Sequence, residues 1–390
     1  MSSSSKKVEI VIVGGGSGAA LAFALSPSLD SSKHNLTVIS PLPFAIHNPA
    51  AARLVVTSAG NLESKQTGAF TPYDRLFKPG KPGRFLQGRV AAVDDREKTV
   101  TLEGTGDKIA YDYLVLATGS VWSGPLSFTQ MNSEDDVLAQ VTQWREKIAK
   151  ADRIVLVGGG AVGIEMAGEI KLAYPSKSVT VINAFNKLLN DAYTDKFRDR
   201  GRDTLEAAGV SVIVDDRLDG VPAEGLVTNN SSGISLRTQK GAELVADLFI
   251  PTFGPRPNTS FLKSFASGAA LSPGGRVNVT PTLNVQLASS SVLPEVWAMG
   301  DIIEWDEQHM LMKATAHLAI VKKNLLATLA GSGGKLAEYQ SGKEMIMVTV
   351  GKGGFGFLPF FGGWIVGNWF VGLIKSGSLF VSMGRKGLGY

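Results

Sequence analysis

The chain of 390 residues contains no cysteine. Disulfide bonds, cysteine-ligated zinc or iron–sulfur centres and a redox-active dithiol are therefore excluded. The same absence excludes reductases of the glutathione, lipoamide and thioredoxin types, which pass electrons through a cysteine pair. It also excludes peroxidases that work through a persulfide or sulfenic acid. We predict no metal site.

The net charge is small as well. Lys and Arg number 39 against 35 for Asp and Glu, which leaves a net charge of +4. No dense basic run with interleaved aromatic residues occurs, so nucleic-acid binding is not expected. With 44% hydrophobic and 19% charged residues, the composition is that of a globular protein.

The first residues, MSSSSKKVEI, lack the apolar core of a secretory signal peptide. Position 2 is Ser2, so the N-myristoylation pattern is missing too. The apolar run from residue 8 to residue 13 is better interpreted as a first β-strand. We therefore expect no signal peptide.

Two βαβ patterns are present in the chain. An apolar run at 8–13 leads into a glycine cluster and an alanine-rich helical pattern, and NLTVIS at 35–40 predicts the next parallel strand. The order recurs at 152–170 and 178–185. We predict an α/β protein with two Rossmann-like dinucleotide-binding domains, one inserted in the other, and a small α+β domain at the C-terminus.

The glycine clusters fit the pattern G-x-G-x-x-G/A, as Gly14, Gly16 and Ala19 and again as Gly158, Gly160 and Gly163. The first glycine allows a tight turn, the second lets a pyrophosphate approach the backbone, and the third small residue lets helix and strand pack closely. The first cluster alone is also compatible with an ordinary glycine turn, and the second is the stronger signal because a clear strand precedes it and a clear helix follows it. Two clusters in one chain predict a carrier dinucleotide and a dinucleotide hydride donor.

The acidic residue that usually holds the adenosine ribose is missing from both units. Its place falls near Ser40 in the first and at Asn183 in the second. Without a carboxylate to repel a 2′-phosphate, strict preference for NADH is not expected. NADH and NADPH therefore both remain candidate substrates.

Three further motifs follow in order: ATGS at 117–120, GPRPN at 254–258 and WAMGD at 297–301. Together with the glycine clusters they resemble the two-dinucleotide-binding-domain flavoprotein reductases over nearly the whole chain. The stretches FAIHNPAAARLVV, HLAIVKKN and LIKSGSLFVS resemble the apoptosis-inducing-factor-homologous family, which includes ferroptosis suppressor protein. This resemblance implies an FAD-dependent NAD(P)H:quinone oxidoreductase.

The resemblance also implies the site residues. The implied FAD ligands are Gly14, Gly16, Ser17, Ser40, His47, Arg53, Val90, Thr118, Gly119 and Asp301. The implied NAD(P)H ligands are Gly158, Gly160, Gly163, Glu165, Asn183 and Gly254. Among these, Asp301 would accept a ribityl hydroxyl, with a helix N-cap as the alternative. His47 would line the flavin site or merely pack beside Pro49.

Three residues are candidates for the catalytic machinery. Glu165 would reach the flavin and the nicotinamide, or would only be favoured by the helix dipole. His317 would be a proton donor or flavin neighbour, or a structural histidine on an apolar helix face. Lys375 would donate to a quinone oxygen, or would be a surface lysine. Trp369 and Phe380 are the candidates for the substrate pocket.

The stretch GGFGFLPFFGGWIVGNWFVGLIK, at 353–375, is apolar but rich in glycine and contains Pro359, so it would be a poor membrane-spanning helix. We expect a loop at 353–363 and a short helix or strand at 364–375, with strands on either side in MIMVTVG at 345–351 and SLFVSMG at 378–384. The stretch would form a dimer or domain interface. Alternatively, 355–375 would form a peripheral membrane contact and quinone entry, with Trp364, Trp369 and Lys375 at headgroup level.

We predict an FAD domain at 1–122 and 250–335, an NAD(P)H domain at 123–249, and a C-terminal domain at 336–390 that faces the membrane, the quinone or a dimer partner. The expected location is the cytoplasmic side of an intracellular membrane, such as that of a mitochondrion or lipid droplet. One alternative is a signalling flavoprotein similar to apoptosis-inducing factor. Another is a reductase for a small redox protein.

Overall fold

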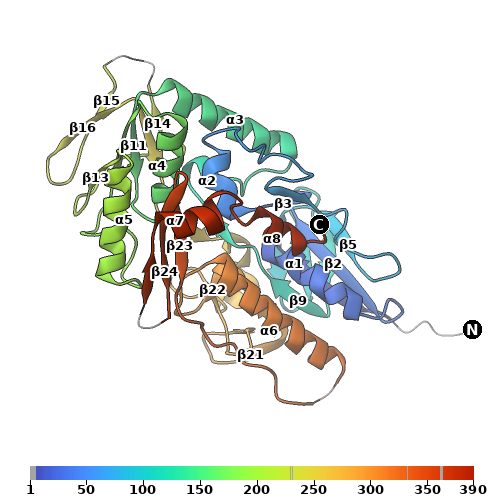
Figure 1. The fold of residues 1–390 in the computed structure, drawn as a ribbon. Helices are drawn as coiled ribbons and strands as arrows, with labels where there is room; N and C mark the ends of the chain where they lie inside the picture. The colour runs from blue at the N-terminus through green and yellow to red at the C-terminus, as the bar shows by residue number, and fades with distance from the viewer. Residues whose placement is uncertain (1–5, 229, 231, 332, 361–362) are drawn as a thin grey trace, which may run out of the picture.

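The structure is a computed structural model that describes residues 6–228, 230, 232–331, 333–360 and 363–390. Two mainly parallel sheets lie beside each other, and the C-terminal segment packs in front of the region where they meet (Figure 1). The predicted α/β class with two Rossmann-like domains is confirmed.

The first sheet has six strands in the order β20-β21-β9-β1-β2-β5. Strands β1, β2, β5, β9 and β21 are parallel, and β20 is antiparallel at the edge. Their bounds are β1 Val8–Val13, β2 His34–Ser40, β5 Arg84–Gln87, β9 Tyr113–Leu116, β20 Asn284–Gln286 and β21 Val292–Ala298. Helices α1 (Gly16–Leu25) and α6 (Leu311–Leu329) pack together against this sheet. The central strand is apolar on both faces because helices and loops cover both.

The second sheet has five strands in the order β13-β12-β11-β17-β14. The bounds are β11 Arg153–Val157, β12 Ser178–Ile182, β13 Ser211–Ile213, β14 Leu226–Val227 and β17 Leu248–Pro251. Its helices are α3 Glu134–Lys150, α4 Ala161–Ala173 and α5 Asp195–Ala207. Strand β17 extends across the boundary predicted between 249 and 250, because its pairing with β11 continues to Pro251.

The chain passes from the first sheet to the second and returns by two connections that lie side by side. Strand β10 (Ser120–Val121) in the outgoing connection pairs antiparallel with β18 (Arg256–Pro257) in the returning one. In addition, Thr118 Oγ1 donates to the carbonyl of Asn258 at 2.6 Å. The second unit is therefore inserted in the first through a short two-stranded neck.

Smaller elements surround the first sheet and the second. They are α2 Ala51–Leu54, β3 Phe44–Ile46, β4 Phe70–Pro72, β6 Val90–Asp94, β7 Thr99–Leu102, β8 Lys108–Ala110, β15 Ile234–Arg237, β16 Glu243–Ala246, β19 Val277–Asn278 and β22 Ile303–Glu304. Short 3₁₀ turns lie at Ser26–Ser28, Asn48–Ala50, Gly124–Leu126, Ser260–Leu262, Phe265–Gly268 and Gly300–Ile302.

The C-terminal segment contains a three-stranded antiparallel sheet followed by helical turns. The elements are β23 Ile346–Val350, β24 Gly353–Leu358, β25 Trp364–Val366, α7 Asn368–Val371, a π-helix at Gly372–Ser376, and α8 Val381–Lys386. Strand β23 packs on α4 and β24 packs on α5, so this segment covers the helices of the second unit.

Two local predictions in this segment are wrong. Residues 353–358 form a strand and no loop, because Gly354 adopts φ 149° and a Cβ there would lie 2.1 Å from the carbonyl oxygen of Val348, so glycine permits this close pairing. The strand expected within 378–384 is a turn leading into α8, with Leu379 and Phe380 in the left-handed region. The 364–375 part is a short strand followed by helical turns, as predicted. Residues 361–362 of the predicted loop lie outside the described part of the chain.

Candidate active site

The two glycine clusters have the same geometry. In the first, the N–H of Gly14 donates to the carbonyl of Ile39 at 2.9 Å, and a Cβ on Gly14 would lie 2.1 Å from the carbonyl oxygen of Ala117. In the second, Gly158 donates to Ile182 at 2.9 Å, and its Cβ would lie 2.8 Å from the backbone of Thr252. In each unit the glycine turn therefore passes directly over the end of the neighbouring parallel strand.

The second glycine of each cluster faces open space. A Cβ on Gly16 or on Gly160 would have no atom within 4 Å, and both glycines are exposed. Each lies at the N-terminal end of a helix, α1 or α4, where free backbone N–H groups favour an anion. Both turns therefore leave room for a pyrophosphate and offer it donors.

Several of the predicted FAD ligands lie around the first glycine turn. The Oγ of Ser17 lies 3.3 Å from where a Cβ of Gly300 would be, and Ser120 Oγ donates to Asp301 Oδ2 at 2.8 Å. Gly119, with φ 68°, faces open space. Asp301 lies inside the 3₁₀ turn and caps no helix with its side chain, so its carboxylate is available beside the turn.

Ser40 and Val90, two further predicted FAD ligands, differ in their position. Ser40 is buried at the end of β2, where a Cβ on Gly15 would lie 2.7 Å from its Oγ and 2.4 Å from the hydroxyl of Tyr73. Burial raises the pKa of Tyr73, so its hydroxyl stays protonated. Val90 begins β6 and pairs with Leu102 in a separate sheet. Its role toward an adenine remains a prediction.

A cavity of about 720 Å³ opens at the second glycine turn. Four of the predicted NAD(P)H residues line it, namely Gly158, Gly160, Asn183 and Gly254. Gly163 lies beneath the turn instead, since its Cβ would meet the carbonyl oxygen of Gly158 at 2.0 Å. The exposed ring of Phe185 is part of the cavity wall and offers a flat apolar surface to a base.

Asn183 organises the wall of this cavity through its side-chain amide. Its Oδ1 accepts from the N–H of Gly159 at 3.1 Å, and its Nδ2 donates to the carbonyls of Phe185 at 3.0 Å and Lys187 at 2.9 Å. The position that often carries a ribose-binding carboxylate thus holds a neutral group that is already hydrogen-bonded. No carboxylate stands at this position to repel a 2′-phosphate, although Asp216 and Asp219 also line the cavity.

Two candidate catalytic residues meet where the second unit contacts the C-terminal segment. Glu165, on α4, accepts from Lys375 Nζ at 2.6 Å and from the N–H of Thr349 at 3.1 Å, all through Oε1. Lys375 also donates to the carbonyl of Met347 at 2.7 Å. Both side chains are buried, so the expected position of Lys375 at headgroup level is wrong.

One helical turn further along α4, the buried Glu169 forms a second ion pair, with the partly buried Arg53. Arg53, on α2 of the first unit, donates to it from Nε and Nη2, both at 2.9 Å. Burial raises the pKa of Glu169, although Arg53 opposes this shift. The described partner of Arg53 is therefore a carboxylate of the second unit, and a contact with the flavin remains a prediction.

His47 lies between the first unit and the C-terminal segment. Its Nε2 is 2.8 Å from the carbonyl of Leu379, and a Cβ on Gly384 would lie 2.4 Å from its Nδ1. Burial, together with nearby Lys375, lowers the pKa of His47. A neutral His47 thus donates to the C-terminal segment, next to the Glu165–Lys375 pair.

The structure does not bring every predicted site residue to the Glu165–Lys375 pair. His317 lies on α6, where its Nδ1 accepts from the N–H of Gly300 at 3.2 Å. Trp369 is 78% exposed on α7, and neither it nor Phe380 lines the 720 Å³ cavity. Glu169 was not predicted, although its spacing of four residues from Glu165 places both carboxylates on one face of a helix.

Comparison with known proteins agrees with this geometry. The profile of the family described as pyridine nucleotide-disulphide oxidoreductase matches residues 8–319. The chain is 36% identical over 340 residues to the FAD-dependent oxidoreductase FVFD30 of Flammulina velutipes, covering 86% of this chain and 99% of that protein. It is 30% identical over 382 residues to ferroptosis suppressor protein 1 of Homo sapiens, covering 97% and 95%.

The fold also matches a solved structure. The crystal structure of reduced CoADR-RHD from Bacillus anthracis superposes with a TM-score of 0.67 at 19% identity. The match covers 90% of this chain but 61% of that one, and at this identity it concerns the fold alone. The chain therefore belongs to the pyridine nucleotide-disulphide oxidoreductase family and is homologous over nearly its full length to ferroptosis suppressor protein 1.

Proposed function

We propose that the protein is an FAD-dependent NAD(P)H:quinone oxidoreductase. The observation that carries the proposal is the buried Glu165–Lys375 pair, which joins the helix of the second glycine turn to a C-terminal segment with an exposed apolar surface. The nucleotide side and an apolar acceptor side thus meet at one pair of charged residues. The family name includes disulphide chemistry, but a chain without cysteine cannot provide the dithiol.

The residues present fit both cofactors. FAD belongs to the first turn, where Gly16 leaves room for the pyrophosphate and Ser17 and Asp301 offer a hydroxyl and a carboxylate. NADH or NADPH belongs to the 720 Å³ cavity at the second turn. When bound, FAD supplies two-electron chemistry, taking a hydride from NAD(P)H and passing electrons to an acceptor.

The protein contributes orientation and electrostatics to the overall reaction, NAD(P)H + H⁺ + quinone → NAD(P)⁺ + quinol. Glu165 and Lys375 lie at the junction where the nicotinamide end of the nucleotide and the acceptor would approach each other. The Lys375 ammonium can donate to a quinone oxygen as negative charge develops there, while Glu165 holds that ammonium in place. His47, neutral and hydrogen-bonded to Leu379, keeps the C-terminal segment in place.

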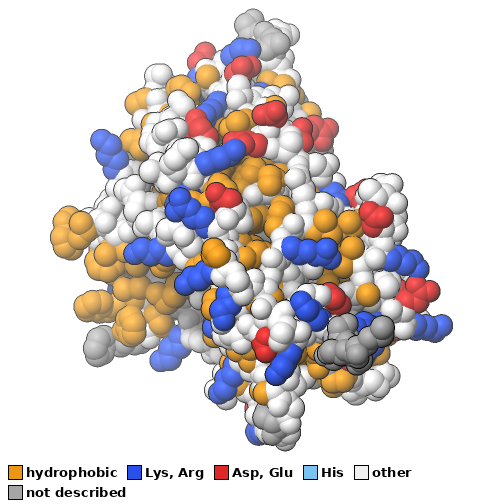
Figure 2. Space-filling view, turned by 90° about the vertical axis from the view of Figure 1, so that its right-hand side faces the viewer, with side chains coloured by type: hydrophobic (Ala, Val, Ile, Leu, Met, Phe, Trp, Pro, Cys, Tyr) orange, Lys and Arg blue, Asp and Glu red, His pale blue; other side chains and the backbone are white. Residues whose placement is uncertain are grey.

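An apolar acceptor is supported by exposed side chains around the π-helix. The C-terminal apolar surface consists of Phe360, Trp364, Trp369, Leu373 and Ile374. Figure 2 shows hydrophobic side chains gathered at the left edge of the view, with Lys and Arg side chains next to them. Exposed tryptophans beside cations are typical of proteins that contact a membrane interface.

We further propose that this surface rests on the cytoplasmic side of an intracellular membrane and admits a long-tailed quinone from it. Among the described residues, no helix combines the length and apolar character needed to cross a bilayer. A homodimer interface on the same surface is the alternative outcome. The contact would involve 355–375, as expected from the sequence.

The test is anaerobic reduction of the purified FAD-loaded protein by NADH and by NADPH, followed by reoxidation with quinones of increasing tail length. We expect reoxidation to be faster with longer tails in the presence of lipid vesicles. Turnover that is no faster with quinones than with oxygen alone would remove the quinone assignment and favour a signalling flavoprotein. Fast reoxidation by a small redox protein only would favour the reductase of such a partner.

A further inference from the structure

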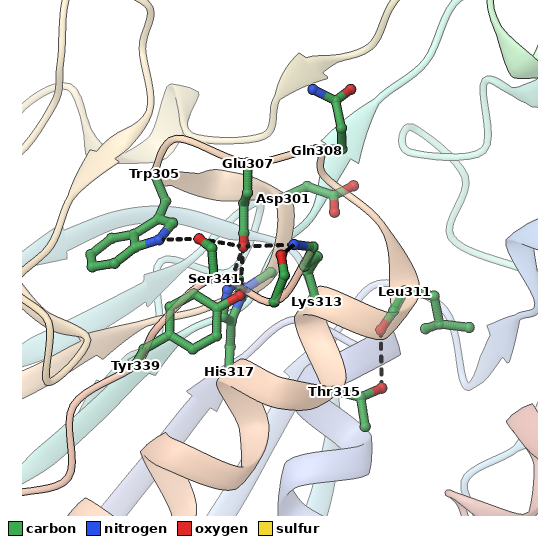
Figure 3. Close-up of polar contacts among 12 residues, drawn as sticks. Asp301, Trp305, Glu307, Gln308, Leu311, Lys313, Thr315, His317, Tyr339 and Ser341 are labelled. Atoms are coloured by element: carbon green, nitrogen blue, oxygen red, sulfur yellow. Dashed lines mark hydrogen bonds and ion pairs between the residues drawn. The ribbon is translucent and has the colours of Figure 1, made fainter. Parts of the chain in front are cut away.

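A polar cluster, buried except for the exposed Ser341, lies beside the 3₁₀ turn that carries Asp301 (Figure 3). Its side chains come from the loop after β22, from α6 and from the segment that leads to β23. The cluster consists of Glu307, Lys313, His317, Tyr339 and Ser341. None of these residues lines the 720 Å³ cavity.

His317 links this cluster to the turn. Its Nδ1 accepts from the backbone N–H of Gly300 at 3.2 Å, and its Nε2 lies 2.8 Å from Oε1 of Glu307. An acceptor at Nδ1 requires the proton to be on Nε2, next to the carboxylate. The imidazole is thus held in one tautomer between the backbone N–H of Gly300 and the carboxylate of Glu307.

Glu307 is held in turn by several groups. Its side chain is fully buried, and Oε2 accepts from the hydroxyl of Tyr339 at 2.5 Å and from that of Ser341 at 3.1 Å. The ammonium of Lys313 lies 3.6 Å from the same oxygen. Lys313 also donates to the carbonyl of Gly342 at 2.6 Å, which ties the cluster to the chain that continues to the C-terminal segment.

We propose that His317 is a positioning residue for the FAD site and takes no part in proton transfer to the substrate. It fixes the Gly300 N–H, and with it the turn that presents the Asp301 carboxylate toward the first glycine turn. Glu307 orients the imidazole for this task. The inference rests on the proposed FAD-dependent function and assigns to His317 a task different from the proton donation that the sequence suggested.

The surroundings of the ring support this assignment. His317 is 1% exposed, and the ring of Tyr339 covers it edge-on with centroids 4.4 Å apart. Nδ1 accepts from Gly300, and the buried Nε2 lies 2.8 Å from Oε1 of Glu307 without the angles of a regular hydrogen bond, so neither nitrogen is open to a substrate. Figure 3 shows the histidine pointing from α6 into the cluster, whereas the Asp301 carboxylate points away from the cluster.

The electrostatics keep the imidazole neutral. Burial lowers the pKa of His317, and His309 and Lys313 act in the same direction, while Glu307 opposes them. A neutral ring can accept from Gly300, whereas an imidazolium would place an N–H donor against the backbone N–H. The turn therefore depends on the neutral tautomer.

The test measures FAD affinity by titrating FAD into apoprotein of each variant. His317→Phe keeps a ring of similar size but removes the acceptor, and we expect about tenfold weaker FAD binding. His317→Asn places Oδ1 where Nδ1 was and can accept from Gly300 but cannot act as an acid. We expect it to bind FAD within about threefold of the wild type and to be reduced by NADH at a similar rate, with an unchanged pH profile.

Two further variants keep the test decisive. Glu307→Gln removes the charge that orients the imidazole, and we expect FAD binding weaker than in the wild type even if His317→Phe does not fold. Thr315→Ala is the matched control, because Thr315 is exposed on the same helix and donates only to the carbonyl of Leu311. It should bind FAD as the wild type does.

The outcomes separate this inference from the proposed function. Wild-type affinity for FAD in both His317→Phe and Glu307→Gln would overturn the positioning role while leaving the FAD enzyme intact. A His317→Asn protein that binds FAD normally but has lost turnover would identify His317 as a proton donor instead. A wild-type protein that binds no FAD would refute the proposed function itself.

Discussion

The carboxylate of Glu165 lies 2.6 Å from the ammonium of Lys375, although 210 residues separate them in the chain. Glu165 belongs to the helix of the second glycine turn, and Lys375 belongs to the π-helix that follows the C-terminal sheet. The pair therefore joins the nucleotide-binding unit to the segment that carries the apolar surface. Since both groups are buried, each depends on the other for compensation of its charge.

Breaking this pair from either side should destabilise the protein more than removing it completely. Glu165→Gln leaves a buried lysine and Lys375→Met leaves a buried carboxylate, so each should lower the free energy of unfolding by about 3 kcal/mol. The double variant should lose less than either single variant, because it leaves no unpaired buried charge. Denaturant unfolding of all four proteins measures the coupling, and additive losses would show that the two groups are independently solvated.

The second glycine of each cluster offers a matched pair of substitutions. A side chain on Gly16 or Gly160 has free space in the protein but would occupy the place of a pyrophosphate. We expect Gly16→Val to fold and to lose FAD. Gly160→Val should retain FAD but be reduced by NADH at least about tenfold more slowly. Flavin absorbance and stopped-flow bleaching distinguish the two, and normal FAD content in Gly16→Val would contradict the first assignment.

The carboxylate of Asp301 should contribute to FAD binding. A hydrogen bond from a ribityl hydroxyl to a charged acceptor is worth roughly 1.5–3 kcal/mol, so Asp301→Ala should weaken FAD binding by at least about tenfold. Asp306→Ala, at an exposed position five residues further along, is the control. Equal flavin content in the two purified variants would show that Asp301 does not hold the cofactor.

Acidification should destabilise the protein before its carboxylates titrate. Burial lowers the folded-state pKa of His47 and of His317, whereas both return toward about 6.5 in the unfolded chain. Between the folded and unfolded values the unfolded chain binds more protons, so stability is lost as pH falls below about 6.5. The slope can reach about 1.4 kcal/mol per pH unit for each histidine.

The measurement is the urea midpoint at several pH values from 7.5 to 5.5, with the wild type and His47→Gln compared. Glutamine can still donate to the carbonyl of Leu379 but cannot take up a proton. The variant should therefore show a shallower decline on acidification. Identical slopes would mean that His47 titrates alike in the folded and unfolded states.

The C-terminal apolar surface should govern contact with lipid. Trp369 and Leu373 are 78% and 69% exposed, and burying two such side chains in a membrane interface is worth about 3 kcal/mol or more. Replacing both with Ser should reduce binding to phospholipid vesicles by at least about tenfold. Activity with a long-tailed quinone should fall, while activity with a short water-soluble quinone should persist.

Val245→Ser provides the control for that experiment, because Val245 is 42% exposed on β16 in the inserted unit. Vesicle flotation and size-exclusion chromatography are run on both proteins. Unchanged flotation together with a smaller hydrodynamic size in the double variant would identify the surface as a dimer interface.

Local sequence was sufficient to predict the large elements. The strand–glycine–helix order predicted β1 with α1 and β11 with α4, because apolar period and turn chemistry are properties of neighbouring residues. Local sequence was not sufficient to predict the structure near the C-terminus. Residues 353–358 form β24 because they pair with β23, and 378–384 do not remain extended because two left-handed residues turn the chain into α8.

The sequence by itself determined the absence of thiol chemistry, the two glycine turns and the long helix that carries His317. These depend on residue type and short spacing. Only the tertiary structure decided which charges meet: Lys375 with Glu165, Arg53 with Glu169, and His317 with Gly300 and Glu307. Such partners come from distant segments, and which charges are buried together is set by how the two units and the C-terminal segment pack.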